Sequence, residues 1–328
     1  MINIVQNRKI SFTISGILFL ASVMLLLTFG LKPGIDFTGG SLIQVSFSGV
    51  RPEVVEIQEA LDPLEYGNIT IQPANDDSYI FKLRFVSEDE HQVILNTIRT
   101  AFEVDASDTA DIESEETITD GDVVKEEAKL VQENRVIEKR IETIGSSISS
   151  HLRSKAWYTA FAVVFAIIFY VAYAFRKVSR PVRSWKFGIT AIIALIHDVA
   201  IVMGLFALLG HYKGVEINVP FVVALLTILG YSVNDTIVVF DRVRENLIKY
   251  GYDKFEYIVN KGVNETLVRS LNTSLTTLVV LFALFIFGGE TIRYFSLALI
   301  VGIISGTYSS IFLASPLLVV WEKFGRRK

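Results

Sequence analysis

Six long apolar runs constrain the fold of this chain more than any other feature of its sequence. A helix needs about 20 apolar residues to cross the roughly 30 Å hydrocarbon core of a bilayer. The runs cover residues 10–30, 157–175, 187–209, 219–240, 267–288 and 294–320. With 51% hydrophobic residues and a mean hydropathy of +0.45, the chain is too apolar for a water-soluble protein of 328 residues. We expect a polytopic α-helical membrane protein with six transmembrane helices.

Basic residues between the runs set the expected orientation. Residues 176–186 carry five basic and no acidic residues, and further basic clusters lie at 8–9 and 326–328. An excess of lysine and arginine is typical of cytoplasmic loops. The loops at 211–218 and 289–293 each carry one basic residue. Both termini are therefore predicted to be cytoplasmic, and those two loops to lie on the outer side.

Residues 31–155 form an acidic block between the first two runs. They contain 25 acidic and 12 basic residues, whereas the rest of the chain contains 10 acidic and 19 basic residues. The first run is longer than the roughly 7 to 15 residues of a signal-peptide core, so we expect an uncleaved anchor. The expected domains are a cytoplasmic N-terminus with helix 1 (1–30), an extracytoplasmic domain (31–155), and helices 2–6 with a cytoplasmic tail (156–328).

The acidic block has the pattern of a small α+β domain. Period-two alternation and helical spacing predict four strands, at 41–47, 68–72, 79–85 and 136–144, and two helices, at 52–61 and 87–102. Ser87 and Glu90 form a capping-box pattern before the second helix. The order βαββαβ predicts a ferredoxin-like fold. Residues 103–135 are interpreted as an exposed acidic insertion with a short helix at 123–134.

Several functional classes are excluded by what the sequence lacks. There are no cysteines, which excludes disulfides, thiolate metal sites and cysteine nucleophiles. Motifs of P-loop NTPases, zinc metalloproteases and serine hydrolases are absent, as is a basic, aromatic surface for nucleic acid. We expect no enzyme activity, no catalytic residue, no metal and no cofactor, and an energy source other than ATP.

The fourth apolar run contains a carboxylate. Asp235, preceded by Asn234, lies about six residues before the cytoplasmic end of this run. A charged side chain at the bilayer centre costs about 2.5–3.5 kcal/mol on insertion scales, and such residues are usually functional. Asp241 and Arg242 lie at the membrane boundary, where side chains reach water. Asp235 is therefore the first candidate for a functional residue.

The fifth run begins with Arg269 at a matching depth. Three further polar residues share its helix face by their spacing: Asn272, Thr273 and Thr276. The geometry of two antiparallel helices permits Asp235 and Arg269 to pair. An arginine favours the ionised form of a carboxyl and desolvation favours the neutral form, so a movement that separates the two residues would bring a proton onto Asp235. The alternative is an ion pair that only fixes helix packing.

Two other runs carry further polar or small residues. His197 and Asp198 lie near the middle of the third run, as secondary candidates for proton coupling or as a polar contact between helices. Gly302, Gly306 and Ser310 recur at four-residue intervals in the last run, which is typical of close helix packing.

Five motifs together resemble one known family. They are GIDFTGG (34–40), ALIHDV (194–199), GYSVNDTIVVFDR (230–242), RSLNTS (269–274) and GTYSS (306–310). In this order, and over nearly the whole chain, they resemble the SecF family of protein-export membrane proteins, which belongs with SecD to the resistance-nodulation-division superfamily.

The resemblance implies partners and a task. SecF proteins are half-units with six transmembrane helices and a large external domain in the bacterial cytoplasmic (inner) membrane. They pair with a SecD-like subunit, work beside the SecYEG channel, and use the proton gradient to assist export of a translocating preprotein. The alternatives that remain are a half-unit of a proton-coupled small-molecule or lipid exporter of the same superfamily, and a passive translocon scaffold.

The resemblance also implies roles for particular residues. Proton coupling falls on Asp235 and Arg269, whose flanking motifs are intact, with Asn234 beside them and His197 and Asp198 as secondary candidates.

The motif at the membrane exit contains Asp36, Phe37, Gly39 and Gly40, where paired glycines permit a tight turn or a close backbone approach. The chain departs from the family at 144–147, which lacks the usual Gly-Pro, and in its long insertion at 103–135. We expect a different hinge geometry at the first of these positions.

Overall fold

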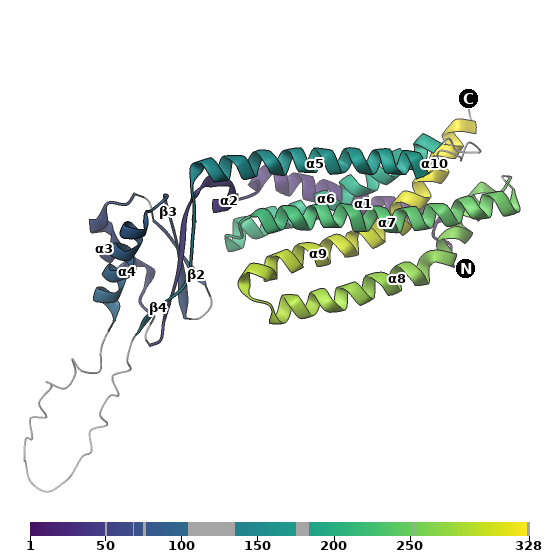
Figure 1. Ribbon diagram of the computed structural model, residues 1–328. Helices are drawn as coiled ribbons and strands as arrows, with labels where there is room; N and C mark the ends of the chain where they lie inside the picture. The colour runs from purple at the N-terminus through teal and green to yellow at the C-terminus, as the bar shows by residue number, and fades with distance from the viewer. Residues whose placement is uncertain are drawn as a thin grey trace, which may run out of the picture. The chain divides into compact units, whose positions relative to one another are not determined.

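The computed structural model describes residues 1–49, 51–67, 69–74, 77–103, 135–174, 184–251 and 253–326. The chain divides into two compact units, Met1–Gly34 with Arg153–Lys328, and Ile35–Leu152. The first unit contains the long helices and the second contains the sheet (Figure 1). Most of the acidic insertion, with the helix predicted at 123–134, lies outside the described residues.

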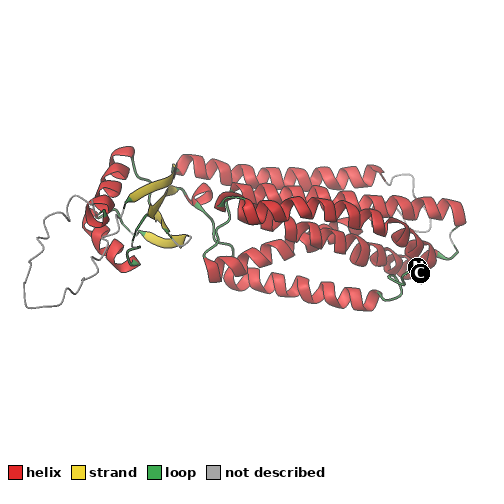
Figure 2. Ribbon diagram, turned by 90° about the horizontal axis from the view of Figure 1, so that it is seen from below, coloured by secondary structure: helices red, strands yellow, loops and turns green. Residues whose placement is uncertain are grey.

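Six helices in the described part of the chain are long and apolar enough to cross a membrane, which confirms the predicted number. Five are single helices: α1 (Arg8–Phe29), α5 (Ser146–Ala174), α6 (Ser184–Lys213), α7 (Val219–Tyr250) and α8 (Phe255–Phe287). The sixth crossing is composed of α9 (Glu290–Ser309), the π-helical turn η2 (Ser310–Ala314) and α10 (Ser315–Arg326). The long helices run side by side in both ribbon views (Figures 1 and 2).

Helices α7 and α8 continue past the apolar runs that predicted them. Their polar ends form an antiparallel hairpin, in which Arg242 Nε and Asn246 Nδ2 each donate to Glu265 Oε2 at 2.7 Å. Gly251 ends α7 with a φ of 83°. Hydropathy marks only the part of a helix that lipid surrounds, whereas backbone hydrogen bonding continues into the aqueous phase. The sequence pattern therefore underestimated the length of both helices.

The sixth crossing forms the centre of the helical unit. Of the residues in its 18-residue apolar stretch, 72% are buried, compared with 6% for the corresponding stretch of α5. Gly302 and Gly306 allow α9 to approach α7 closely. A Cβ on Gly302 would overlap the Ile228 side chain, and one on Gly306 would lie 2.9 Å from Ser232 Cβ. Close approach at small residues is a general feature of helix packing in membranes.

The second unit has the order βαββαβ after a one-turn helix, α2 (Ile35–Thr38). Its strands are β1 (Gly40–Phe47), β2 (Thr70–Ala74), β3 (Ser78–Leu83) and β4 (Val136–Ile144). Its helices are α3 (Val54–Leu61), followed by the 3₁₀ turn η1 (Asp62–Leu64), and α4 (Glu88–Phe102). The sheet order is β2-β3-β1-β4 with every pair antiparallel, which is the ferredoxin-like arrangement that the sequence predicted. Only Gly145 separates β4 from α5.

Helices α3 and α4 lie on one face of this sheet (Figure 1). Ile43 and Phe81 stand opposite each other on β1 and β3 and are fully buried. They belong to one apolar cluster with Ile57 of α3 and Ile94 of α4. The period-two and helical patterns of the sequence therefore converge on a single core.

A capping box begins α4, as the sequence predicted. Ser87 Oγ accepts from the Glu90 backbone N–H at 3.4 Å, and Glu90 Oε2 accepts from the Ser87 N–H at 2.8 Å. Arg84 Nη2 also contacts Glu90 Oε1 at 2.6 Å. The Arg84 guanidinium, with the Ser87 N–H, holds the pKa of Glu90 below its ordinary value.

The paired glycines after α2 occupy conformations that other residues rarely adopt. Gly39 has a φ of 76° and Gly40 a φ of 128°. A Cβ on Gly40 would lie 2.6 Å from the carbonyl oxygen of Leu83 on β3. Glycine at this position therefore allows β1 to begin directly against β3.

We expect Gly40→Ala to destabilise the second unit by about 1–3 kcal/mol, because it adds backbone strain and a contact with the Leu83 carbonyl. Hydrogen exchange of the β1 and β3 amides in the full chain should become faster. The control is Gly145→Ala, where the nearest atom to an added Cβ is 3.9 Å away and φ is not positive. Equal exchange in the two variants would contradict the interpretation.

Ser87→Ala should destabilise the first turn of α4 by about 1 kcal/mol, because it removes the side-chain acceptor of the cap. Because the folded pKa of Glu90 is lowered, its contribution is complete above the unfolded pKa and is lost as the pH falls through the folded pKa. The protection factors of the first-turn amides, which correct for the slower intrinsic exchange at low pH, should therefore fall in the variant, and on acidification in the parent chain. Thr100→Ala, at the exposed far end of α4, should change neither.

Candidate functional site

Asp235 lies where α7, α8 and η2 meet, and its exposed fraction is 7%. Its Oδ1 accepts a hydrogen bond from Ser270 Oγ of α8 at 2.5 Å. Its Oδ2 is buried and makes no hydrogen bond of ordinary geometry to a described residue, although the Ser310 hydroxyl of η2 is near enough to interact with the carboxyl. The next residue, Thr236, places its Oγ1 2.8 Å from Ser310 Oγ of η2. One oxygen of this buried carboxyl is thus held in place while the other is not.

Arg269 does not form the ion pair that its depth permits. The partner of Asp235 on α8 is Ser270, and the other carboxyl oxygen has no partner within the described chain. Successive residues of an α-helix are rotated by about 100°, so a helix that presents Ser270 to α7 directs Arg269 elsewhere. Arg269 is exposed, although its charge still interacts electrostatically with Asp235.

The residues that share a face with Arg269 are exposed as well. We call Arg269, Asn272, Thr273 and Thr276 the outward polar face of α8. Thr273 and Thr276 donate hydrogen bonds to carbonyls of their own helix at 3.0 Å. Asn234, one residue before Asp235 on α7, is also exposed. Of the predicted coupling residues on these two helices, only Asp235 therefore lies inside the unit.

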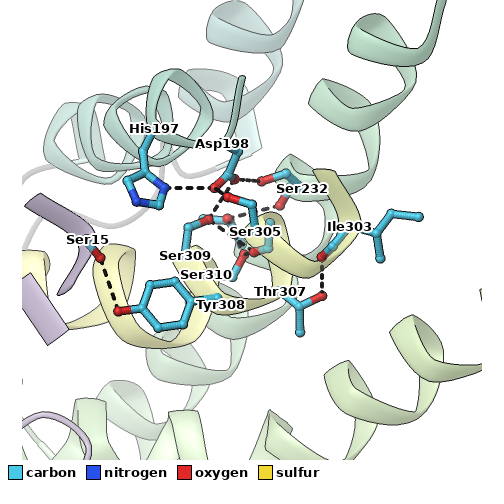
Figure 3. A network of polar contacts seen from close by, with 12 residues as sticks. Ser15, His197, Asp198, Ser232, Ile303, Ser305, Thr307, Tyr308, Ser309 and Ser310 are labelled. Atoms are coloured by element: carbon cyan, nitrogen blue, oxygen red, sulfur yellow. Dashed lines mark hydrogen bonds and ion pairs between the residues drawn. The ribbon is translucent and has the colours of Figure 1, made fainter. Parts of the chain in front are cut away.

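Asp198 is fully buried in α6 and accepts four hydrogen bonds (Figure 3). His197 Nδ1 and Ser305 Oγ lie 3.0 and 2.8 Å from Oδ1. Ser232 Oγ and Ser309 Oγ donate to Oδ2 at 2.6 and 2.7 Å. Four donors match the acceptor sites of an ionised carboxylate. The Asp198 site therefore ties α6 to α7 and α9. Both oxygens of Asp198 have hydrogen-bond donors, whereas only one oxygen of Asp235 has a donor.

Helix α9 and the turn η2 place hydroxyls at the Asp198 carboxyl and beside Asp235. Ser305 and Ser309 bind Asp198, whereas Ser310 contacts Thr236 beside Asp235. Between them, Thr307 Oγ1 lies 2.5 Å from Ser274 Oγ of α8. The predicted packing residue Ser310 thus lies at a polar junction, one residue after Ser309.

The motif predicted at the membrane exit belongs to the second unit. Asp36 and Phe37 lie in α2, and Gly39 and Gly40 form the turn into β1. These residues lie in a different compact unit from Asp235. Their observed geometry accounts for the start of the sheet.

The serines that bind the two carboxyl groups were not predicted as site residues. They are Ser232, Ser270, Ser305 and Ser309. Serine is common in membrane helices, and its hydroxyl often bonds a carbonyl of its own helix. The four-residue spacing of Ser305 and Ser309 was the one available signal, because it places both on one face of α9.

The geometry gives the two carboxyl groups different capacities. Asp235 can accept a proton on Oδ2 without losing its bond from Ser270. Protonation of Asp198 would displace one of its four donors. Among the described residues, no group of three or more histidine, cysteine, aspartate or glutamate side chains is arranged to hold a metal.

Two family descriptions match this chain. "Protein export membrane protein SecD/SecF, C-terminal" covers residues 123–324, and "SecD/SecF GG Motif" covers residues 25–49. A protein translocase subunit SecF from Thermobaculum terrenum is 40% identical over 98% of this chain and 94% of the relative. The SecF subunit from Desulfurispirillum indicum is 37% identical over 96% of this chain and 90% of the relative.

A solved structure has the same fold. The crystal structure of SecDF, a translocon-associated membrane protein from Thermus thermophilus, superposes with a TM-score of 0.77 at 30% sequence identity. The match covers 98% of this chain and 39% of the SecDF chain, so the chain spans well under half of that protein. The matched motifs, the relatives at 37–40% identity and the shared fold agree, and the chain belongs to the SecF family of protein translocase subunits.

Proposed function

We propose that this chain is an accessory subunit of the Sec preprotein translocase, which works with a SecD-like partner and uses the proton gradient to assist protein export. Its relatives are named protein translocase subunits, and the matching structure is of a translocon-associated protein. The observation that carries the mechanism is the buried Asp235 carboxyl, with one oxygen bonded to Ser270 and the other without a partner.

Proton binding at Asp235 changes the charge at the junction of α7, α8 and η2. In the ionised state the carboxylate attracts the Arg269 guanidinium and the Ser270 hydroxyl. Neutralisation removes the attraction to Arg269, so the relative energies of two helix arrangements change. Moving one charge through the membrane potential supplies about 2.3 kcal/mol per 100 mV. Coupling in this form needs no cofactor, because the gradient supplies the energy.

The outward polar face of α8 supports the need for a partner. Asn272 and Thr276 lie within the apolar stretch of α8 and are exposed on this chain. Polar side chains inside a membrane usually face a protein interior or a water-filled cavity and seldom face lipid. A SecD-like subunit that covers this face would enclose Arg269 and Asn234 and complete the surroundings of Asp235.

The same proposal includes the location of the chain and its further partners. The chain lies in the bacterial cytoplasmic membrane with both termini in the cytoplasm and the second unit outside, as the basic loops indicate. SecYEG and the translocating preprotein are the further partners. A half-unit of a small-molecule or lipid exporter, and a passive scaffold, remain the competing functions that export assays distinguish.

Asp235→Asn should abolish the gradient-dependent part of preprotein export, because an amide cannot exchange a proton at this position. The measurement is export into inverted membrane vesicles with and without an imposed proton gradient. Asp241→Asn is the matched control, since Asp241 is an exposed carboxylate on the same helix and pairs with Arg244. Unchanged gradient dependence in Asp235→Asn would favour the scaffold.

The outward polar face should cross-link to the partner. The chain has no cysteine, so one introduced cysteine reports a single position. We expect Thr276→Cys to form a disulfide with single cysteines in the membrane helices of the SecD-like subunit. Leu20→Cys is the control, because Leu20 is 67% exposed on the apolar outer side of α1. Equal cross-linking at both positions, or none at Thr276, would contradict the proposed contact.

A further inference from the structure

We infer that His197 is a second proton-binding residue, with Nε2 as the acceptor atom and Asp198 as the residue that positions the ring. The inference rests on the proposed proton-driven function and extends it to the seam between α1, α6 and α9. It divides the pair: His197 carries the proton, and Asp198 stays a fixed anion.

The His197 ring is buried, and only one of its two nitrogens has a hydrogen-bond partner. Its exposed fraction is 3%, and its Nδ1 lies 3.0 Å from Asp198 Oδ1. Its Nε2 is buried and makes no hydrogen bond to any described residue. Since Asp198 accepts at this oxygen, the Nδ1 atom carries a proton and the Nε2 lone pair is free in the neutral ring. A buried polar atom without a partner is rare in native structures, and a catalytic or ion-binding role is one of its recognised causes.

The His197 ring contacts two aromatic side chains, one from α1 and one from α9. The Phe19 ring of α1 is stacked with the His197 ring at a centroid distance of 6.4 Å, and the Tyr308 ring of α9 is stacked with it at 6.5 Å. These contacts hold the ring plane while leaving the Nε2 edge unbonded. Asp198 and Tyr308 are the titratable neighbours of the ring, and α1 contributes no charged group to this contact.

A row of hydroxyls on α1 lines the same seam. The buried residues of α1 are all serines, Ser11, Ser15 and Ser22, although the helix is otherwise strongly apolar. Ser15 Oγ donates to Tyr308 Oη at 3.3 Å (Figure 3). Tyr308 Oη donates in turn to the Ser11 carbonyl at 3.2 Å. A serine row alone indicates only close packing. Together with an unpartnered imidazole nitrogen beside it, the row provides polar groups along which a proton can approach.

Protonation of His197 acts on the same helices that hold Asp235. A proton from the aqueous phase binds the Nε2 lone pair, and the resulting imidazolium is neutralised by the adjacent Asp198 carboxylate. Asp198 in turn holds Ser232, which lies one turn before Asp235 on α7. It also holds Ser309, the neighbour of Ser310. The charge of His197 is therefore connected to both helix turns that surround Asp235.

The protonation state of His197 can be measured directly. Nitrogen-15 spectra of histidine-labelled chain, reconstituted with its SecD-like partner in liposomes, are compared with spectra of His197→Gln to assign the signal among the four histidines. We expect Nδ1 to stay protonated throughout and Nε2 to gain a proton when the sample is acidified. The opposite tautomer at high pH, or an Nε2 signal that does not change, overturns the inference.

The positioning role of Asp198 is tested in the same spectra. Ser309→Ala removes one donor of the anion while leaving Asp198 in place, and should shift the ring-nitrogen signals of His197. Asp198→Asn should mix the two neutral tautomers. A purely structural contact would change the stability of the complex without changing the tautomer or these signals.

Export assays separate this inference from the proposed function. His197→Gln should lose most of the gradient-dependent export and keep the gradient-independent part. His211→Gln, at an exposed histidine in the last turn of α6, should change neither. If Asp235→Asn loses the gradient response and His197→Gln keeps it, the inference fails and the proposed function stands. If both variants keep the response, the proposed function itself fails.

Discussion

The helical unit depends on one constraint, which is that a polar group placed in hydrocarbon must find its partners inside the protein. Helix α9 and the turn η2 contribute to this on two carboxyl-bearing helices: Ser305 and Ser309 bind Asp198 of α6, and Ser310 contacts Thr236 of α7. The glycines of α9 bring it close enough to α7 for short serine side chains to bridge the gap, and longer side chains at Gly302 or Gly306 would push the helices apart. The hydrogen bonds of these buried polar groups therefore depend on the close packing of the helices.

The two carboxyl groups meet this requirement to different degrees, and the difference separates structure from chemistry. Asp198 has four donors from three helices, so its loss would leave several hydroxyls without an acceptor. Asp235 has one donor and one unpartnered oxygen. In the sequence, the evidence for Asp198 and for Asp235 was of the same kind, namely an aspartate placed deep in an apolar run. Only the count of donors distinguishes the two groups, and the proposed function assigns the anchor to Asp198 and the exchanged proton to Asp235.

The sequence predicted which helices and strands form better than it predicted which face of each helix points to its neighbours. Apolar runs and period-two alternation predicted six crossings and the βαββαβ sheet, because burial repeats regularly along each element. The contact of Asp235 was not predictable, because Arg269 and Ser270 are adjacent and helix periodicity does not say which one faces α7. The serines around Asp198 were hidden for a related reason: a hydroxyl can bond its own helix, as Thr273 does, or a neighbouring helix. The π-helical turn η2 has no recognisable pattern in the sequence and changes the phase of the helix after Ser310.

The position of Asp235 within the unit explains why this fold is suited to be one half of an assembly. The sixth crossing is mostly buried, whereas only 17% of the residues in the apolar stretch of α8 are buried. Asp235 lies between these two surroundings, with its inner side against Ser310 and Thr236 and its outer side against a helix whose far face is polar and exposed. Water or lipid on that far face would screen or expel the Arg269 charge, whereas protein would hold it near the carboxyl. The electrostatics of the site thus depend on what covers α8, and under the proposed function a partner on this face would control when Asp235 binds a proton.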